Sequence, residues 1–309
     1  MGGMEAEDPK SLGQDMSASF DLSVIIVNYN VKELLYRCLK TILEDQSQRK
    51  IEVVVIDNAS SDGSTEMVKD NFPKVKVVVN SRNLGFAKGA NQGIKQSQGK
   101  YIFLLNPDAS IKIDQLDKMI DLMEENREIA ICGPKITDDQ GNLQYSCRRF
   151  PSYLTSISSS QSLLFKLFPG NPLSGNYLLT EDGHEKQTEV DWVSGSGLLA
   201  RRDILDRIGG LDERFFMYVE DVDLCYRAKK DGGKVFYFPG VKMRHLIGGS
   251  TRKEKGEMIV QHHKSMYLFY EKYYAPRSIL SVAVLWGIFL RMGVALSGYV
   301  LKSAVKRNA

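Results

Sequence analysis

The sequence contains few cysteines, and their spacing fits neither a metal site nor a disulfide framework. Among its 309 residues there are four, far apart and without a C-x-x-C pair: Cys38, Cys132, Cys147 and Cys225. This spacing excludes the common zinc motifs and the framework of a small secreted domain. The sequence therefore indicates a reducing compartment, and we expect a cytoplasmic protein.

The chain also lacks a strong charge of either sign and an N-terminal apolar segment. Its formal net charge is +3, which leaves no general footprint for nucleic acid, so we expect no nucleic-acid partner. Residues 1–20 are polar and lack the apolar core of a secretory signal. We expect this stretch to be a disordered tail.

Several catalytic fingerprints are missing. No G-x-G-x-x-G turn follows the first predicted strand, where VNYN stands at 27–30, and this weighs against a nicotinamide-dependent dehydrogenase. A nucleotidyltransferase would also carry a glycine-rich loop at that place. No nucleophile elbow or Cys–His signature is present either.

Short apolar runs alternate with helical patterns through the first 130 residues. Strands are predicted over 22–27, 52–56, 75–79 and 101–105, and helices over 32–44, 64–71 and 86–98. Short Val- and Ile-rich strands that alternate with helices are typical of a parallel sheet covered on both faces. The sequence therefore predicts an α/β fold that binds its ligand at the carboxyl ends of the strands.

Polar residues follow these strands at the points where they end. Asp57 can accept a hydrogen bond from a nucleotide or can close an Asx turn, and the pattern alone favours neither. Asn106 and Asp108 follow the fourth strand within NPD. A carboxylate there can bind Mg²⁺ or Mn²⁺, although the tripeptide by itself fits an ordinary turn better.

A further acidic cluster lies in FFMYVEDVDLCYR, at residues 215–227. Glu220, Asp221 and Asp223 stand at a predicted helix start, where the helix dipole stabilises acidic side chains by about 0.3–1 kcal/mol. Asp223 and Arg227 are spaced for a surface ion pair, so a structural explanation would suffice. The preceding aromatic residues instead indicate a cleft wall, in which a carboxylate can act as a general base.

Taken in order, these segments resemble the family 2 inverting glycosyltransferases of the GT-A fold, especially their rhamnosyltransferase-like branch. The matching segments run from about residue 22 to 250: SVIIVNYN, VVVIDNASSDGS, NSRNLGFAKGANQGI, LLNPDA, WVSGSGLLARRD, GGLDERFFMYVEDVDLCYR and RHLIGGS. The resemblance implies a Rossmann-like, mostly parallel sheet flanked by helices. It also implies transfer of a sugar from a nucleotide-sugar to a hydroxyl group in one inverting displacement.

The resemblance implies roles for individual positions. Asp221 matches the catalytic base. Asn106 and Asp108 occupy the metal-binding D-x-D positions, with Asn in place of the first Asp. Asp108 and His245 are then the expected ligands of a divalent metal, Mg²⁺ or Mn²⁺. The residues expected to contact the donor nucleotide are Asn28, Asp57, Arg82, Asn83, Gly85 and Asn106. Those expected to border the sugar and the acceptor are Trp192, Gly195, Gly197 and Glu220.

The resemblance favours dTDP-rhamnose as donor, with UDP-hexoses and UDP-galactofuranose as alternatives. The expected acceptor is a hydroxyl group of a glycan or a lipid-linked saccharide in cell-surface polysaccharide synthesis. A rival from another class is a non-catalytic nucleotide-sugar-binding scaffold. The presence of both Asp108 and Asp221 weighs against that rival.

The C-terminal segment has a different composition. No acidic residue follows Glu271, and on a helical wheel Arg277, Arg291, Lys302 and Lys306 share one face. This pattern favours a helix that lies on the membrane surface with its cations at anionic headgroups. Two alternatives stay open. One is a membrane-spanning helix, which a central Arg291 would disfavour by about 2.5–3.5 kcal/mol. The other is packing on the catalytic domain or on a second subunit.

We therefore expect three regions in the chain. Residues 1–20 form the tail, and residues 21–256 form the glycosyltransferase domain, with a nucleotide-binding half at 21–135 and an acceptor half at 136–256. Residues 257–309 form a helical extension. An irregular loop is predicted over 151–189, where Ser, Pro, Gly and Asn are frequent. We expect the protein at the inner face of the cytoplasmic membrane.

Overall fold

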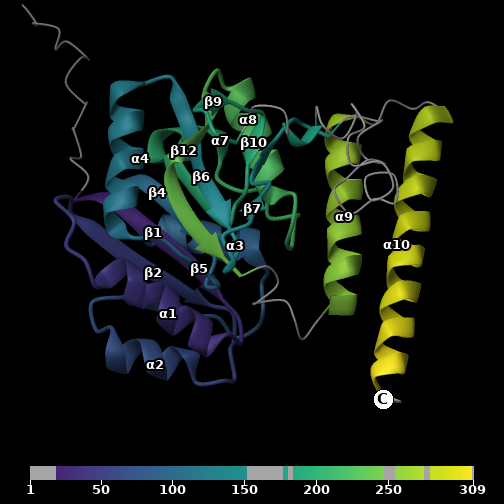
Figure 1. Ribbon diagram of the computed structural model, residues 1–309, viewed down its shortest axis with the longest axis horizontal. Helices are drawn as coiled ribbons and strands as arrows, with labels where there is room; N and C mark the ends of the chain where they lie inside the picture. The colour runs from purple at the N-terminus through teal and green to yellow at the C-terminus, as the bar shows by residue number, and fades with distance from the viewer. Residues whose placement is uncertain (1–18, 152–176, 180–183, 247–254, 275–278, 308–309) are drawn as a thin grey trace, which may run out of the picture.

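The computed structural model describes residues 19–151, 177–179, 184–246, 255–274 and 279–307 (Figure 1). Most of the tail predicted over 1–20 and most of the loop predicted over 151–189 lie outside these ranges, and Phe20 already belongs to the first strand. The described strands are β1 (Phe20–Asn28), β2 (Ile51–Asp57), β3 (Lys76–Val79), β4 (Gly99–Leu105), β5 (Ala109–Ser110), β6 (Ile129–Thr137), β7 (Leu143–Gln144), β8 (Cys147–Arg148), β9 (Thr188–Glu189), β10 (Trp192–Val193), β11 (Gly197–Arg201) and β12 (Lys234–His245). The described helices are α1 (Lys32–Leu43), α2 (Ser64–Asn71), α3 (Phe86–Lys95), α4 (Ile113–Glu125), α7 (Arg202–Ile208), α8 (Glu220–Lys230), α9 (Lys255–Tyr273) and α10 (Ile279–Arg307).

The predicted α/β fold is confirmed. The main sheet has the strand order β3-β2-β1-β4-β11-β6-β12-β5, and its first four strands are parallel to one another. The chain leaves β1 toward β2 and β3 and then returns to the other side of β1 with β4. The carboxyl ends of β1 and β4 are therefore the switch point of the sheet, where such folds bind ligands.

Both faces of this sheet are buried, which explains its nearly continuous apolar strands. Alternate residues of β1 enter different cores, because successive side chains of a strand point to opposite faces. Val24 and Ile26 pack into the core that includes α1 and α4, whereas Ile25 and Val27 pack into the core that includes α3 and α8.

Strand β5 pairs antiparallel with the end of β12, and this pairing connects two distant parts of the sequence. His245 lies opposite Ala109, and the backbone N–H of Leu246 donates to the Asp108 carbonyl over 2.9 Å. The turn after β4 and the end of β12 are thereby held at the same edge of the sheet. Asp108 and His245 become neighbours as a result.

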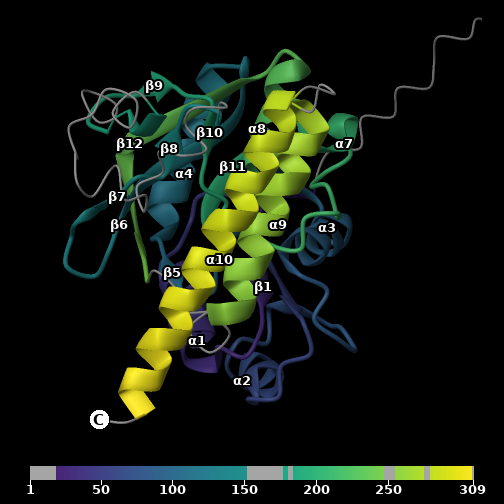
Figure 2. The same cartoon turned by 90° about the vertical axis from the view of Figure 1, so that its right-hand side faces the viewer.

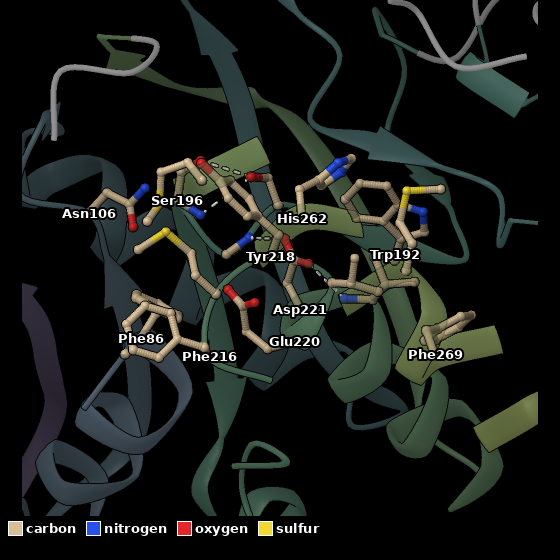
Figure 3. Close-up of a pocket in the computed structure, with 18 of the residues that line it drawn as sticks. Phe86, Asn106, Trp192, Ser196, Phe216, Tyr218, Glu220, Asp221, His262 and Phe269 are labelled. Carbon is tan, nitrogen blue, oxygen red and sulfur yellow. Dashed lines mark hydrogen bonds between the residues drawn. The ribbon is translucent and has the colours of Figure 1, made fainter. Parts of the chain in front are cut away.

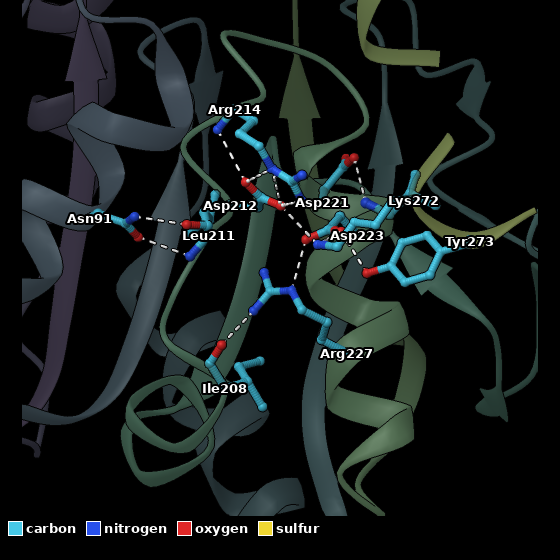
Figure 4. Close-up of polar contacts among 11 residues, drawn as sticks. Asn91, Ile208, Leu211, Asp212, Arg214, Asp221, Asp223, Arg227, Lys272 and Tyr273 are labelled. Carbon is cyan, nitrogen blue, oxygen red and sulfur yellow. Dashed lines mark hydrogen bonds and ion pairs between the residues drawn. The ribbon is translucent and has the colours of Figure 1, made fainter. Parts of the chain in front are cut away.

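Helices α9 and α10 lie together beside the sheet domain, with α10 outermost (Figures 1 and 2). A buried polar cluster fastens α9 to α8 (Figure 4). Asp223, which is fully buried, accepts hydrogen bonds from Lys272 Nζ (2.6 Å), the Tyr273 hydroxyl (2.7 Å) and Arg227 Nε (2.8 Å). The expected Asp223–Arg227 pair is therefore present, but it belongs to a buried cluster and not to the surface.

Candidate active site

A cavity of about 540 Å³ opens at the switch point of the sheet (Figure 3). Its walls come from the residues after β1 and β4, from the turn before β11, from the start of α8, and from α9 and α10. In Figure 3, Asn106 and Trp192 lie on opposite sides of Asp221. The cavity therefore has one side near the strand ends, which we call the nucleotide side because the sequence predicts nucleotide binding there, and a second side near α9, with Asp221 between them.

Asp221 is held in the cavity by two backbone donors. Its Oδ2 accepts a hydrogen bond from the Gly195 N–H and its Oδ1 accepts one from the Val222 N–H, both over 2.8 Å. Burial raises the pKa of Asp221, and these two hydrogen bonds act in the opposite direction. A fixed carboxylate with a raised pKa is suited to accept a proton.

The turn before Asp221 has an unusual backbone. Tyr218 and Val219 have φ values of 67° and 69°, in the left-handed region that non-glycine residues rarely occupy. The conformation is especially costly for the β-branched Val219, at about 1–3 kcal/mol per strained residue. This strained turn begins α8 and directs the acidic pair into the cavity.

Glu220 lines the cavity next to Asp221 and is 6% exposed. Its Oε2 is buried and, within the described part of the chain, has no hydrogen-bond partner. Burial raises the pKa of Glu220 well above its usual range, and the neighbouring Asp221 charge raises it further. The two carboxyl groups thus favour one shared negative charge, which we assign to Asp221 because the backbone donors favour its ionised form.

Asp108 and His245 meet at the nucleotide side, as the β5–β12 pairing requires. Asp108 Oδ1 lies 3.2 Å from His245 Nε2, and the Asn106 amide nitrogen lies 3.4 Å from the same ring nitrogen. Gln144 fixes the ring from the other side: its amide nitrogen donates to the His245 carbonyl over 2.6 Å, and its Oε1 lies 3.1 Å from His245 Nδ1. Since Oε1 is an acceptor, Nδ1 carries a proton, and when Nε2 carries none its lone pair faces the Asp108 carboxylate.

This arrangement fits a divalent metal. Two acceptor atoms that face each other at 3.2 Å repel unless a cation or a proton lies between them. A metal-binding histidine commonly donates its other ring N–H to a fixed acceptor, as His245 does to Gln144. Within the described ranges, no cluster of three or more His, Cys, Asp or Glu side chains could hold a metal. The remaining ligands would therefore have to come from a bound diphosphate and water, as is usual for Mg²⁺.

The predicted nucleotide residues divide into two groups. Asn83, Gly85 and Asn106 line the cavity. Gly85 has φ = 82°, and a Cβ on it would lie 2.3 Å from the Phe216 carbonyl, so only glycine allows this close packing against the turn that precedes α8. Arg82 is exposed and is not among the residues that line the cavity.

Asn28 and Asp57 lie side by side at the ends of β1 and β2 but are not among the lining residues. The Asn28 amide donates to Asp57 Oδ2 over 2.8 Å, and the Ser60 N–H donates to Asp57 Oδ1 over 2.7 Å. Asp57 thus closes the turn that follows β2, which is one of its two expected functions. Its contact with a nucleotide stays a prediction.

On the other side of the cavity, Trp192 and Gly195 line the wall as expected. The Trp192 ring N–H donates to the Arg149 carbonyl over 2.9 Å, which fixes the ring. Gly197 lies outside the lining. It is buried at the start of β11, where an added Cβ would meet Met243 Sδ at 2.5 Å, so its small size serves strand packing.

Several lining residues were not predicted from the sequence. Tyr29 and Asn58 lie within quoted motifs, one position from residues that were singled out. His262 in α9 packs edge-on against Tyr218, with ring centroids 5.4 Å apart. Burial, followed by the neighbouring His263 and two arginines, lowers the pKa of His262 to about 4. A single histidine or arginine in an apolar helical pattern has no distinctive spacing. The sequence of α9 and α10 therefore did not indicate that these helices line the cavity.

Helix α10 differs from its predicted cationic face. Arg291 is partly buried and lines the cavity, so it does not share the exposed side of the helix with Trp286, Leu290 and Val294. Arg277 lies outside the described residues. By length and composition alone, the window Val282–Leu301 of α10 could cross a membrane, and 6% of that window is buried.

Comparison with known proteins identifies the family. The family model for glycosyl transferase family 2 matches residues 23–209. The chain is 31% identical to the N-acetylglucosaminyl-diphospho-decaprenol L-rhamnosyltransferase of Mycobacterium tuberculosis, over 80% of this chain and 83% of that protein. It is 26% identical to the rhamnosyltransferase WbbL of Escherichia coli strain K12, over 84% of this chain and 94% of that protein.

A solved structure supports the fold. A mannosyltransferase from Pyrobaculum calidifontis in complex with GDP-Man and Mn²⁺ superposes with a TM-score of 0.55 at 17% identity, covering 94% of this chain and 76% of that one. Because the family model spans more than half of the sequence, the chain belongs to glycosyl transferase family 2.

Proposed function

We propose that this family 2 glycosyltransferase transfers L-rhamnose from dTDP-rhamnose to a hydroxyl group of a lipid-linked, diphosphate-bearing saccharide in cell-surface polysaccharide synthesis. The observation that carries the proposal is the position of Asp221, fixed by Gly195 between the nucleotide side and the α9 side of one cavity. The sugar is supported by the two similar rhamnosyltransferases, and the acceptor by the name of the Mycobacterium tuberculosis protein.

In this proposal Asp221 is the general base. It accepts the proton of the acceptor hydroxyl group while the oxygen of that group attacks the anomeric carbon from the face opposite the nucleotide. A single displacement inverts that carbon and leaves the nucleoside diphosphate as leaving group. Trp192, Gly195 and Glu220 border the reacting sugar and the acceptor. Glu220 stays protonated beside the ionised Asp221.

The nucleotide binds at the ends of the parallel strands. Asp108 and His245 would hold the divalent metal, Mn²⁺ or Mg²⁺. When bound, such a cation neutralises charge on the departing diphosphate. The side chains proposed to contact the nucleotide are Asn28, Asp57, Arg82, Asn83 and Asn106, with Gly85 allowing its close approach. Gly197, at the start of β11, supports the wall that borders the sugar and the acceptor.

Helix α10 is proposed to lie on the membrane surface, at the inner face of the cytoplasmic membrane. Its outer side exposes Trp286, Leu290 and Val294, which are 72%, 71% and 67% exposed. Apolar side chains of this size on one face of a helix favour insertion at the boundary of headgroups and acyl chains. The position suits a lipid-linked acceptor.

The membrane proposal is tested by co-sedimentation with phosphatidylglycerol vesicles. We expect Leu290→Glu to weaken binding strongly, whereas Val79→Glu, at a 54% exposed site on β3, leaves it unchanged. If Leu290→Glu and Val79→Glu bind the vesicles equally well, α10 does not contact the membrane.

The function itself is tested by product analysis with a panel of donors. Purified protein is incubated with dTDP-rhamnose, a UDP-hexose or UDP-galactofuranose, with Mn²⁺ or Mg²⁺, and with farnesyl-diphospho-N-acetylglucosamine. We expect transfer of rhamnose with inversion. Transfer only from a UDP-sugar would reassign the donor. Donor binding with neither transfer nor hydrolysis would instead support a non-catalytic nucleotide-sugar-binding scaffold.

A further inference from the structure

The α9 side of the cavity contains two arginines from distant parts of the chain. Arg148 comes from β8 and Arg291 from α10, and both line the cavity. The Arg148 guanidinium lies 5.2 Å from the centre of the Trp192 ring and 5.8 Å from that of Tyr177, and its Nε donates to the Tyr145 carbonyl. A stacked guanidinium of this kind is held in place while it still presents N–H donors.

The charges that line the cavity are separated along it. Among the described lining residues, the carboxylates are Asp108, Glu220 and Asp221, at the nucleotide side and in the centre. His262 lies at the α9 side, and it is neutral at pH 7 because its pKa is lowered to about 4, first by burial, then by the neighbouring His263 and then by Arg291 and Arg148. The two arginines therefore supply the positive charge at this end.

We propose that Arg148 and Arg291 form a phosphate subsite that binds the diphosphate of the acceptor. This inference rests on the proposed function, in which the acceptor carries a diphosphate. Guanidinium groups bind phosphate oxygens through paired N–H donors, which favours arginine over lysine at such a site.

The position of the subsite assigns it to the acceptor and not to the donor. The donor diphosphate belongs with Asp108 and His245. Asp221 must contact the acceptor hydroxyl group, which attacks the donor sugar from the face opposite the nucleotide, so an anion on the far side of Asp221 belongs to the acceptor. Arg291 also stands on the same helix as the exposed apolar residues Trp286 and Leu290. A lipid that lies along α10 would bring its headgroup diphosphate to Arg291.

Helix α10 would then serve in substrate recognition as well as in membrane contact. It would carry the apolar contact on one side and an acceptor-binding cation on the other. The specificity of the enzyme for diphosphate-linked acceptors would depend on this helix, which lies beyond the segment matched by the family model.

The test compares two acceptors that differ in the diphosphate. Initial rates are measured in phospholipid-free detergent with farnesyl-diphospho-N-acetylglucosamine and with the neutral octyl N-acetylglucosaminide. We expect Arg291→Gln and Arg148→Gln each to raise the KM for the diphosphate acceptor about tenfold or more. The KM for dTDP-rhamnose should change little, the loss of rate with the neutral acceptor should be much smaller than with the diphosphate acceptor, and Arg291→Lys should recover part of the loss. Arg127→Gln, at an exposed position after α4, is the matched control.

Other results of this experiment would overturn the phosphate subsite or the proposed acceptor. An equal loss with both acceptors means that the arginines only maintain structure, and a raised donor KM means that they bind the donor; either result overturns the subsite. Phosphatidylglycerol vesicles that compete with the diphosphate acceptor in the wild type but not in Arg291→Gln would assign the arginines to a membrane headgroup and would also overturn it. If the wild type hydrolyses dTDP-rhamnose but transfers to neither acceptor, the acceptor class of the proposed function fails. Inhibition of that hydrolysis by the diphosphate acceptor, weaker in Arg291→Gln, would then still support the subsite, and equal inhibition would reject it.

Discussion

Asp108 Oδ1 lies 3.2 Å from His245 Nε2, although one residue follows β4 and the other ends β12, far apart in the sequence. The β5–β12 pairing brings them together, and Gln144 fixes the proton of the ring on Nδ1. The pair consequently directs two acceptor atoms at one point, which is the geometry expected of a partial metal site completed by the substrate.

The first prediction concerns this metal site. Because His245 is one of two protein ligands in our account, His245→Ala should raise the Mn²⁺ concentration needed for half-maximal donor binding about tenfold or more. Gln144→Ala should act in the same direction, since loss of such a supporting hydrogen bond typically costs 10–100-fold in metal affinity or activity. Thermal shift with dTDP-rhamnose over a Mn²⁺ titration measures both, because ligand binding raises the melting temperature by mass action. If the Mn²⁺ titration of His245→Ala matches that of the wild type, His245 is not a metal ligand.

The second prediction concerns Glu220 and pH. Burial and the Asp221 charge raise the pKa of Glu220 in the folded protein well above its ordinary value of 4.5. The protonated form is thus favoured by folding, and this stabilisation is present below pH 4.5 and is lost as the pH rises through the raised pKa. Glu220→Gln resembles the protonated form at every pH.

Glu220→Gln should therefore melt at a higher temperature than the wild type at pH 8, and the difference should shrink toward pH 4.5. Melting curves across this range provide the measurement, with Glu125→Gln at an exposed site of α4 as control. A difference that grows as the pH falls would contradict the assignment.

The third prediction concerns the contact that holds the base. A Cβ on Gly195 would lie 3.2 Å from the Cβ of Asp221, so Gly195→Ala forces a small displacement of the carboxylate. Because misplacement by 1 Å can cost about a hundredfold in rate, we expect kcat to fall about tenfold while the donor KM changes little. Gly287→Ala adds a Cβ to α10 in open space and should leave kcat unchanged. Equal kcat values for the two variants would mean that Gly195 does not position the base.

The fourth prediction concerns the attachment of α9. Lys272 donates to both Asp212 and the fully buried Asp223, so Lys272→Met leaves buried carboxylate oxygens with fewer partners. We expect the free energy of unfolding to fall by about 2 kcal/mol, less than for a fully buried pair because Lys272 is partly exposed. Chemical denaturation measures the change, and Lys264→Met on the exposed side of α9 is the control. Equal stability of the two variants would show that the cluster does not fasten the helix.

The parallel half of the fold could be predicted from the sequence because its signals are local. The predicted strands over 22–27 and 101–105 lie within β1 and β4, and the predicted helix over 64–71 coincides with α2. The boundaries differ by a few residues, as in α3, which ends at Lys95 and not at 98. Short apolar runs and turn residues determine such elements with little help from distant contacts.

The parts of the site that depend on tertiary contacts could not be read in the same way. The spacing of Asp223 and Arg227 is the same for a surface pair and for a buried cluster, and only Lys272 and Tyr273 from α9 distinguish the two. The helical wheel placed Arg291 on a cationic face predicted to contact the membrane. A wheel does not show which side of a helix packs on the domain. Asp108 and His245 were predicted to share a metal only through the family resemblance. Neither NPD nor RHLIGGS alone indicates that the two residues meet in the fold.

The central claim is that Asp221 removes the proton of the acceptor hydroxyl group. It is tested by single-turnover transfer from dTDP-rhamnose in Asp221→Asn, alongside donor binding by thermal shift, with Asp206→Asn at an exposed site of α7 as control. We expect transfer to fall by about 10²–10⁴-fold, while the thermal shift induced by the donor and Mn²⁺ is retained. If Asp221→Asn transfers rhamnose at a rate close to that of the wild type, Asp221 is not the general base.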